Sequence, residues 1–258
     1  MLASAGKPRL LITGVTGLLG HTLAPDLIIH TAAMTSVDEC ERNPGQADRV
    51  NVQGTRNVLR ALKGGRCSLV HISTDSVFDG EKGHYREEDK TNPVHVYGKT
   101  KLAAEQEVAE YRPDALIIRT CIYGWNLVPK PSLAEWVVRS LQEGKSISGF
   151  ADLFFSPIPT VLLSRLLLTL ARENLYGILH VTGGEGCSKF DFARRCALEF
   201  DLDPQKILPV ASASAKQTVR RPADVTLAVD KAARLLGRPL PSIEDGLRAF
   251  HSSEPLLS

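Results

Sequence analysis

Residues 9–20, R-L-L-I-T-G-V-T-G-L-L-G, decide the fold of this 258-residue chain. Arg9–Thr13 is a short apolar run typical of a buried strand, and Gly14, Gly17 and Gly20 follow it at regular spacing. A strand, a glycine-rich turn and a helix start form an arrangement that binds a pyrophosphate, because glycine lets backbone N–H groups approach the phosphates and the helix dipole favours negative charge. An ordinary turn with close packing is the alternative. The position directly after a strand-like run favours a dinucleotide site.

Apolar runs of strand type alternate with helix-like segments through the first half of the chain. The runs are RLLIT, DLIIHTA, SLVHIS and ALIIRT, with helices expected over about 47–62 and after Tyr97. Short apolar runs separated by amphipathic segments indicate βαβ units, in which helices cover both faces of a parallel sheet. We therefore predict an α/β fold of the Rossmann type, with a doubly wound parallel sheet.

The character of the chain changes from Trp125 onward. A Pro-containing loop leads into helix-like segments over 132–143 and 158–173, and another helix is expected to begin at Ser188. The apolar run GILHVT, near 177–182, is expected to return to the sheet. We predict two domains.

The first is a dinucleotide-binding domain over residues 1–125, joined by the strand near 177–182. The second is mainly a substrate-binding lobe over residues 126–258, with the substrate held between them.

The stretch Val96–Lys101, V-Y-G-K-T-K, supplies the most specific chemistry. Tyr97 and Lys101 stand four residues apart at the head of a helix-forming run, so both lie on one helix face. An ammonium beside a phenol favours the phenolate and lowers the phenol pKa, as a general acid for a carbonyl group requires. Ser73 and Thr74, in H-I-S-T-D-S-V-F-D, offer hydroxyls to the same substrate oxygen. A YxxxK pattern alone is also compatible with an exposed helix turn.

These motifs together carry a family resemblance. The segments T-G-V-T-G-L-L-G, I-I-H-T-A-A, N-V-Q-G-T, H-I-S-T-D-S-V-F-D-G, Y-x-E-E-D, N-P-V-H-V-Y-G-K-T-K and R-R-P-A-D-V-T-L-A-V-D-K occur in the family order. From about Arg9 to about Gly246 the chain resembles the extended short-chain dehydrogenase/reductases, and specifically the dTDP-4-dehydrorhamnose reductase group. That group includes a non-catalytic relative, the regulatory β subunit of methionine adenosyltransferase.

The resemblance implies an NADPH- or NADH-dependent reductase that acts on the keto group of a nucleotide-linked 4-keto-6-deoxy sugar. Its implied catalytic residues are Thr74, Tyr97 and Lys101. The implied cofactor-binding residues are Gly14, Gly17, Leu18, Leu19, Gly20, Ala32, Ala33, Thr35, Asn51, Ser73, Tyr97 and Lys101. The implied substrate-binding residues are Thr74, Asp75, Ser76, Arg220 and Arg221.

Asn51 is also expected to satisfy backbone groups beside the site, and Asp75 to hold the Thr74 loop by accepting backbone N–H bonds. The basic cluster of Lys216, Arg220 and Arg221 is either a solvated patch or a diphosphate site, for which the arginine fork is well shaped.

The chain departs from the family pattern in two places. Roughly 35 to 40 residues are absent between Gly20 and Asp26, including the second strand, whose end recognises the ribose 2′ position. Either the numbering runs on across a segment that is missing from the sequence, or the protein truly lacks this segment and with it half of the adenosine pocket. The sequence therefore does not choose between NADPH and NADH. Ser76 replaces the usual family tyrosine, which we interpret as a change in substrate fit.

Two other functions remain open from the sequence. A regulatory or scaffold protein of the same fold is favoured by the short link and by Ser76, whereas intact Thr74, Tyr97 and Lys101 oppose it. A nucleotide-sugar epimerase or dehydratase shares the YxxxK machinery. Dehydratases usually carry an Asp-Glu pair after the threonine, and Asp75-Ser76 does not supply it.

Composition agrees with a cytoplasmic enzyme. The formal net charge of +2 gives no electrostatic reason to expect nucleic acid or membrane as a partner. The start of the chain lacks the apolar core of a signal peptide. Five cysteines without a CxxC pair indicate reduced thiols, and the histidines lack metal-ligand spacing, so we expect no metal. A homodimer is a further expectation.

Overall fold

The computed structural model describes residues 10–13, 26–62, 67–126, 130–173, 175–214 and 219–254. A five-stranded sheet lies at its centre, and every neighbouring pair of strands in it is parallel, which confirms the predicted fold class. In spatial order the strands are β1 (Leu10–Thr13), β2 (Leu27–His30), β3 (Ser68–Ile72), β4 (Leu116–Arg119) and β9 (Gly177–His180).

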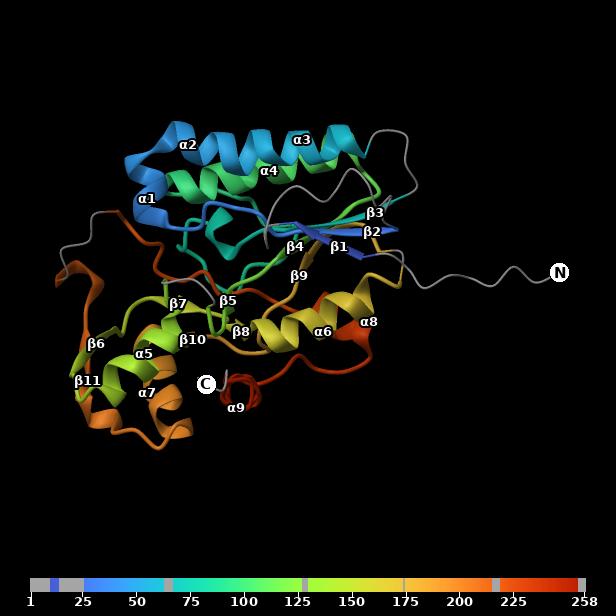
Figure 1. Cartoon of the computed structure of the whole chain (residues 1–258). Coiled ribbons are helices and arrows are strands. Elements are labelled where there is room, and N and C mark those ends of the chain that lie inside the picture. Colours follow the sequence, from blue (N-terminus) through green and yellow to red (C-terminus); the bar gives the residue numbers. More distant parts are fainter. Residues whose placement is uncertain are drawn as a thin grey trace.

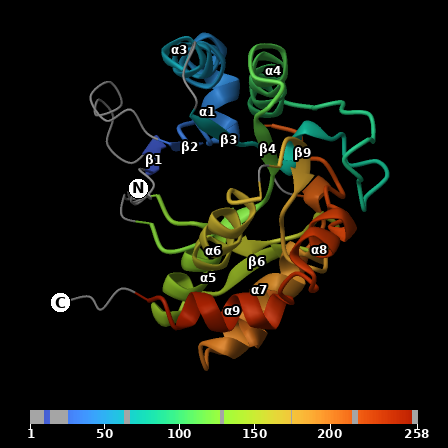
Figure 2. The ribbon, with the colours of Figure 1, turned by 90° about the vertical axis from the view of Figure 1, so that its right-hand side faces the viewer.

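Helices cover both faces of this sheet (Figures 1 and 2). One face carries α3 (Gly54–Ala61) and α4 (Val96–Tyr111), and the other carries α6 (Thr160–Leu170) and α8 (Asp230–Leu236). Successive side chains of a strand point to opposite faces. Ile28 and Ile117 therefore pack in the core under α3 and α4, while their neighbours Ile29 and Ile118 pack in the core under α6.

The helix expected over about 47–62 is continuous but not regular. It is assembled from α2 (Pro44–Asp48), the π-helical turn Arg49–Gln53 and α3, and the short α1 (Val37–Arg42) precedes it. The π turn contains the buried Asn51, so this irregular backbone lies beside the predicted site.

The second lobe has its own core below the sheet in Figure 1. Its helices are α5 (Leu133–Gln142), α7 (Lys189–Glu199) and α9 (Ile243–His251), and its strands are β5 (Ile122–Tyr123), β6 (Ile147–Phe150), β7 (Phe154–Phe155), β8 (Ile158–Pro159), β10 (Cys187–Ser188) and β11 (Ile207–Val210). Short 3₁₀ turns occupy Asp75–Val77, Pro204–Lys206 and Ser212–Ser214. Ser132 and Ser188 cap α5 and α7, as their positions in the sequence predicted.

The short link noted in the sequence joins two adjacent strands. β1 pairs directly with β2, with Leu10 opposite Leu27, and residues 14–26 make the connection. In a full Rossmann sheet the first strand lies between the second and the fourth. Here β1 is an edge strand, and Leu10 and Ile12 are 43% and 44% exposed. No strand of the described ranges occupies the outer side of β1. Within those ranges, too, no helix is both long and apolar enough to cross a bilayer.

Candidate active site

A cavity of about 590 Å³ opens at the carboxyl ends of β2, β3 and β4. This is the edge at which ligands bind in doubly wound sheets. Its walls combine both lobes, because β5 and α5 of the second lobe complete the lining together with α6, which covers one face of the sheet. Eight residues predicted from the sequence line it: Ala33, Thr35, Ser73, Thr74, Asp75, Ser76, Tyr97 and Lys101. Ala32, Asn51, Arg220 and Arg221 are not part of this lining. The glycine-rich turn, with Gly14, Gly17, Leu18, Leu19 and Gly20, lies outside the described residues.

Local capping and close packing bring Tyr97 to the Thr74 loop. His95 precedes α4 in extended conformation, and its Nδ1 accepts the N–H of Gly98 at 3.1 Å. A Cβ on Gly98 would collide with the carbonyl oxygen of Ser76. Glycine at this position therefore lets the first turn of α4 lie directly against residues 74–76.

Thr74 links Tyr97 to a buried carboxylate. The Thr74 hydroxyl is hydrogen-bonded to the Tyr97 phenol, donates to Asp75 Oδ1 at 3.0 Å and accepts the N–H of Ser76 at 3.2 Å. Asp75 also accepts from the Ser76 hydroxyl at 3.1 Å, and it is hydrogen-bonded to the Cys121 thiol. Asp75 thus holds this loop through hydroxyl and thiol groups rather than through the backbone N–H groups that we expected. Burial raises the pKa of Asp75.

The predicted effect of Lys101 on Tyr97 is corrected by the structure. Burial in the cavity wall raises the pKa of Tyr97; the Thr74 hydrogen bond opposes this rise, whereas the nearby Asp75 charge adds to it. Lys101 Nζ instead donates to the Ile72 carbonyl at 2.6 Å and lies 3.5 Å from His71 Nε2. Burial lowers the pKa of Lys101 to about 8. Helical spacing places the two side chains on one face of α4, but the burial of each side chain has the larger effect on its pKa.

Ser73 and Asn51 are engaged by the protein itself. The Ser73 hydroxyl donates to the buried Glu105 carboxylate at 2.5 Å, whereas we expected this hydroxyl to contact substrate or cofactor. Asn51 is 1% exposed; its amide accepts the N–H of Met34 at 2.7 Å and donates to the Thr100 hydroxyl at 2.9 Å. In this structure Asn51 is therefore a positioning residue that joins the segment after β2 to α4, as its expected structural role requires.

The two arginines of the late basic cluster differ in their surroundings. Arg221 Nη2 forms an ion pair of 2.8 Å with Asp38 Oδ2 at the start of α1, which ties the second lobe to the first. Arg220 is exposed, and Lys216 lies outside the described residues. The solvated-patch alternative therefore does not describe Arg221, whose guanidinium is held at the junction between the lobes.

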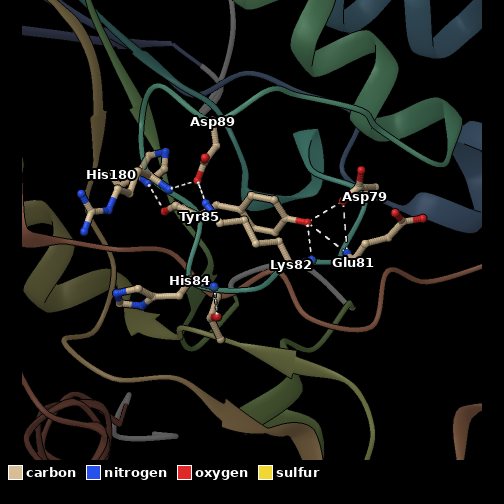
Figure 3. Close-up of polar contacts among 9 residues, drawn as sticks. Asp79, Glu81, Lys82, His84, Tyr85, Asp89 and His180 are labelled. Atoms are coloured by element: carbon tan, nitrogen blue, oxygen red, sulfur yellow. Dashed lines mark hydrogen bonds and ion pairs between the residues drawn. The ribbon is translucent and has the colours of Figure 1, made fainter.

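Tyr85 makes a second junction between the lobes (Figure 3). Its hydroxyl donates to Asp79 at 2.5 Å and accepts the N–H groups of Glu81 and Lys82. Its backbone N–H and carbonyl pair with Thr226 and Ala228, just beyond Arg221 in the chain. The acid-rich segment after β3 is thereby anchored to the late segment that carries Arg221.

Several cavity residues could not be found from sequence motifs. Cys121, Asn126, Lys130 and Ser132 line the cavity from the segment between β4 and α5, and Thr160 and Ser164 line it from α6. Lys130 Nζ donates to the Thr35 hydroxyl at 3.4 Å across the mouth of the site. Burial raises the pKa of the Cys121 thiol, so this cysteine stays protonated near neutral pH. Only the junction of the lobes brings these residues to the cavity.

Comparison with known proteins identifies the family of this chain. A family model described as the RmlD substrate binding domain matches residues 15–254. The chain belongs to this family. One relative, a dTDP-4-dehydrorhamnose reductase of Sinorhizobium fredii, is 34% identical over 240 residues, which cover 87% of this chain and 79% of the relative. The enzyme of the same description from Mycolicibacterium smegmatis is 33% identical, and the match covers 86% of this chain and 69% of the relative.

Solved structures of the same family share the fold. The dTDP-4-dehydrorhamnose reductase of Bacillus anthracis in complex with NADP superposes with a TM-score of 0.83 at 33% identity, covering 89% of this chain and 81% of that one. The Yersinia enterocolitica reductase gives a TM-score of 0.80 at 26% identity, and the match covers 89% of this chain and 81% of that chain. Both solved chains are longer than this RmlD-family chain.

Proposed function

We propose that this chain is an NADPH- or NADH-dependent reductase of a dTDP-linked 4-keto-6-deoxy sugar. The observation that carries the proposal is that Thr74, Tyr97 and Lys101 line one cavity at the carboxyl edge of the sheet, with the Lys101 ammonium held by the Ile72 carbonyl at 2.6 Å. The relatives named above, described as dTDP-4-dehydrorhamnose reductases, support this substrate class.

The cavity fits the nicotinamide end of such a cofactor. Ala33 and Thr35 line it beside the end of β2, and Lys101 places a buried cation at its floor. Small side chains and hydroxyl groups suit a flat ring and a ribose, and the ammonium can donate to ribose oxygens. The cofactor, when bound, supplies the hydride, and the protein supplies position and charge.

The chain's own residues carry out the proton chemistry. The Thr74 hydroxyl orients the sugar carbonyl, and Tyr97 gives its phenolic proton to the oxygen as the carbonyl is reduced. The raised pKa of Tyr97 keeps the phenol protonated, which a proton donor requires. As the carbonyl oxygen gains negative charge it becomes strongly basic and takes the phenolic proton, which leaves a Tyr97 phenolate in the wall of the cavity. General acid catalysis of this type contributes about 10² to 10⁴-fold in rate.

Two features support a reductase rather than the alternatives. The intact Thr74, Tyr97 and Lys101 set opposes a scaffold without turnover. Asp75 followed by Ser76 lacks the second carboxylate expected of a dehydratase, and the Ser76 hydroxyl is taken up by Asp75. A cytoplasmic location and a homodimer belong to the same proposal as expectations from the sequence and family.

The test is turnover with the sugar nucleotide. The purified chain is mixed with NADPH or NADH and a dTDP-4-keto-6-deoxy sugar, and both cofactor absorbance and product mass are followed. We expect one cofactor oxidised for each sugar that gains two hydrogens. Cofactor binding without any sugar-dependent oxidation would contradict the proposal and favour the scaffold alternative.

A further inference from the structure

A buried ion pair lies beneath the wall of the cavity. Arg119, at the end of β4, binds Glu105 on α4 through two nitrogens, with Nη2 to Oε2 at 2.7 Å and Nε to Oε1 at 3.0 Å. Both side chains are only 3% exposed. The guanidinium also lies 5.1 Å from the centre of the Phe78 ring, which is fully buried. This bidentate geometry fixes the Glu105 carboxylate in orientation as well as in place.

The third member of the cluster reaches the cavity. Ser73 donates its hydroxyl to Glu105 Oε1 at 2.5 Å, and Ser73 is the neighbour of Thr74 in the chain. Glu105 stands one helical turn after Lys101 and two turns after Tyr97 on α4. The carboxylate therefore joins the helix that carries Tyr97 to the loop that carries Thr74.

Stability alone does not explain this arrangement. Taking two charges out of water costs free energy that their attraction repays only in part, and replacing a buried ion pair by apolar residues is often neutral or stabilising. An apolar contact would, however, allow α4 to turn or slide on the sheet. The bidentate pair and the Ser73 bond are directional, so they favour one orientation of the helix against the sheet.

We propose that Glu105, held by Arg119 and Ser73, is a positioning residue for the reduction: it fixes α4 against β3 and β4 so that the Tyr97 phenol meets the Thr74 hydroxyl. This inference rests on the proposed function and assigns a role to residues that do not touch substrate. A misplacement of about 1 Å in such a site can cost on the order of 10²-fold in rate.

Glu105 has a second, electrostatic effect on the site. Its charge raises the pKa of Lys101 against the effect of burial, which lowers that pKa to about 8. The other titratable groups near Lys101 are His71 on β3 and His30 on β2, and burial lowers the pKa of both, to about 4 for His30. Both imidazoles are neutral near neutral pH, so Glu105 is the charge that can be changed to test its effect. Loss of its carboxylate lowers the Lys101 pKa, and Lys101 then loses its charge at lower pH.

The test compares variants of the Glu105–Arg119 pair with a control on the same helix as Glu105. Glu105→Gln leaves the Arg119 charge buried without its carboxylate and is expected to unfold at lower temperature. The double variant Glu105→Leu with Arg119→Met removes both charges and keeps an apolar contact, so it is expected to fold. Glu107→Gln is the matched control, because Glu107 lies on the same helix and pairs at 2.6 Å with Arg56 of α3.

We expect the folded double variant to lose about 10²-fold in kcat with a smaller change in KM for the sugar, and its alkaline decline in rate to begin at lower pH. The control should keep the wild-type kcat and pH profile. Titration of Lys101 by NMR, assigned with Lys101→Met, should show the lowered pKa independently of turnover. An active wild type together with a folded double variant of unchanged kcat and unchanged Lys101 titration would overturn this inference. An inactive wild type would overturn the proposed function instead.

Discussion

Replacing Tyr97 by phenylalanine removes one hydroxyl from the centre of the site. Thr74 would keep its contacts with Asp75 at 3.0 Å and with the N–H of Ser76 at 3.2 Å, so the loop retains its anchors. The lost hydrogen bond is worth about 0.5 to 1.5 kcal/mol of stability, which a folded domain tolerates. The loss of the proton donor should lower kcat by about 10² to 10⁴-fold.

The assay is the initial rate of sugar-dependent cofactor oxidation, accompanied by a cofactor titration and a thermal melt. We expect the cofactor affinity and the melting temperature of Tyr97→Phe to remain close to those of the wild type, because the Lys101 contact with Ile72 is untouched. Tyr111→Phe is the control, since Tyr111 ends the same helix and is 63% exposed. A Tyr97→Phe protein that keeps more than about a tenth of the wild-type kcat would refute the general-acid assignment.

Three further predictions concern Lys101 and Arg221. Lys101→Met should lower both kcat and cofactor affinity, and a normal cofactor affinity measured by titration would contradict the assigned contact. Because burial lowers the Lys101 pKa to about 8, its positive charge is present below that pH and lost above it, so the wild-type rate should decline above about pH 8 in a pH profile of kcat. Arg221→Ala should raise KM for the dTDP-sugar by roughly 10 to 150-fold, the value of one hydrogen bond to a charged group, with little change in kcat. If steady-state kinetics showed an unchanged KM and weaker cofactor binding, Arg221 would not bind the diphosphate and its pair with Asp38 would be purely a link between the lobes.

Local patterns explain why much of the architecture could be predicted. The alternation of apolar runs and helix-like segments indicated the parallel sheet, and the Ser caps marked the starts of α5 and α7. These features depend on residues close in the chain. The four-residue spacing of Tyr97 and Lys101 likewise placed both on α4, and the cavity includes both.

Contacts between distant residues decided the rest. Lys101 was expected to act on its helical neighbour, but its ammonium bonds Ile72, 29 positions away. Ser73 was assigned to the ligand, but its hydroxyl bonds Glu105, 32 positions away. Arg221 was expected either in a solvated patch or at a diphosphate, and in the structure it pairs with Asp38, 183 positions away.

By itself the sequence determined the α/β class and the family, and it named the residues that we propose for proton transfer. It did so because periodicity and helical spacing are properties of neighbouring residues. The tertiary structure alone decided which of those groups are protonated, which are engaged by the protein and which face the cavity. Burial and hydrogen bonding are set by segments that meet only after folding, and they shift the pKa of Tyr97 and Lys101 more than the spacing between the two residues does.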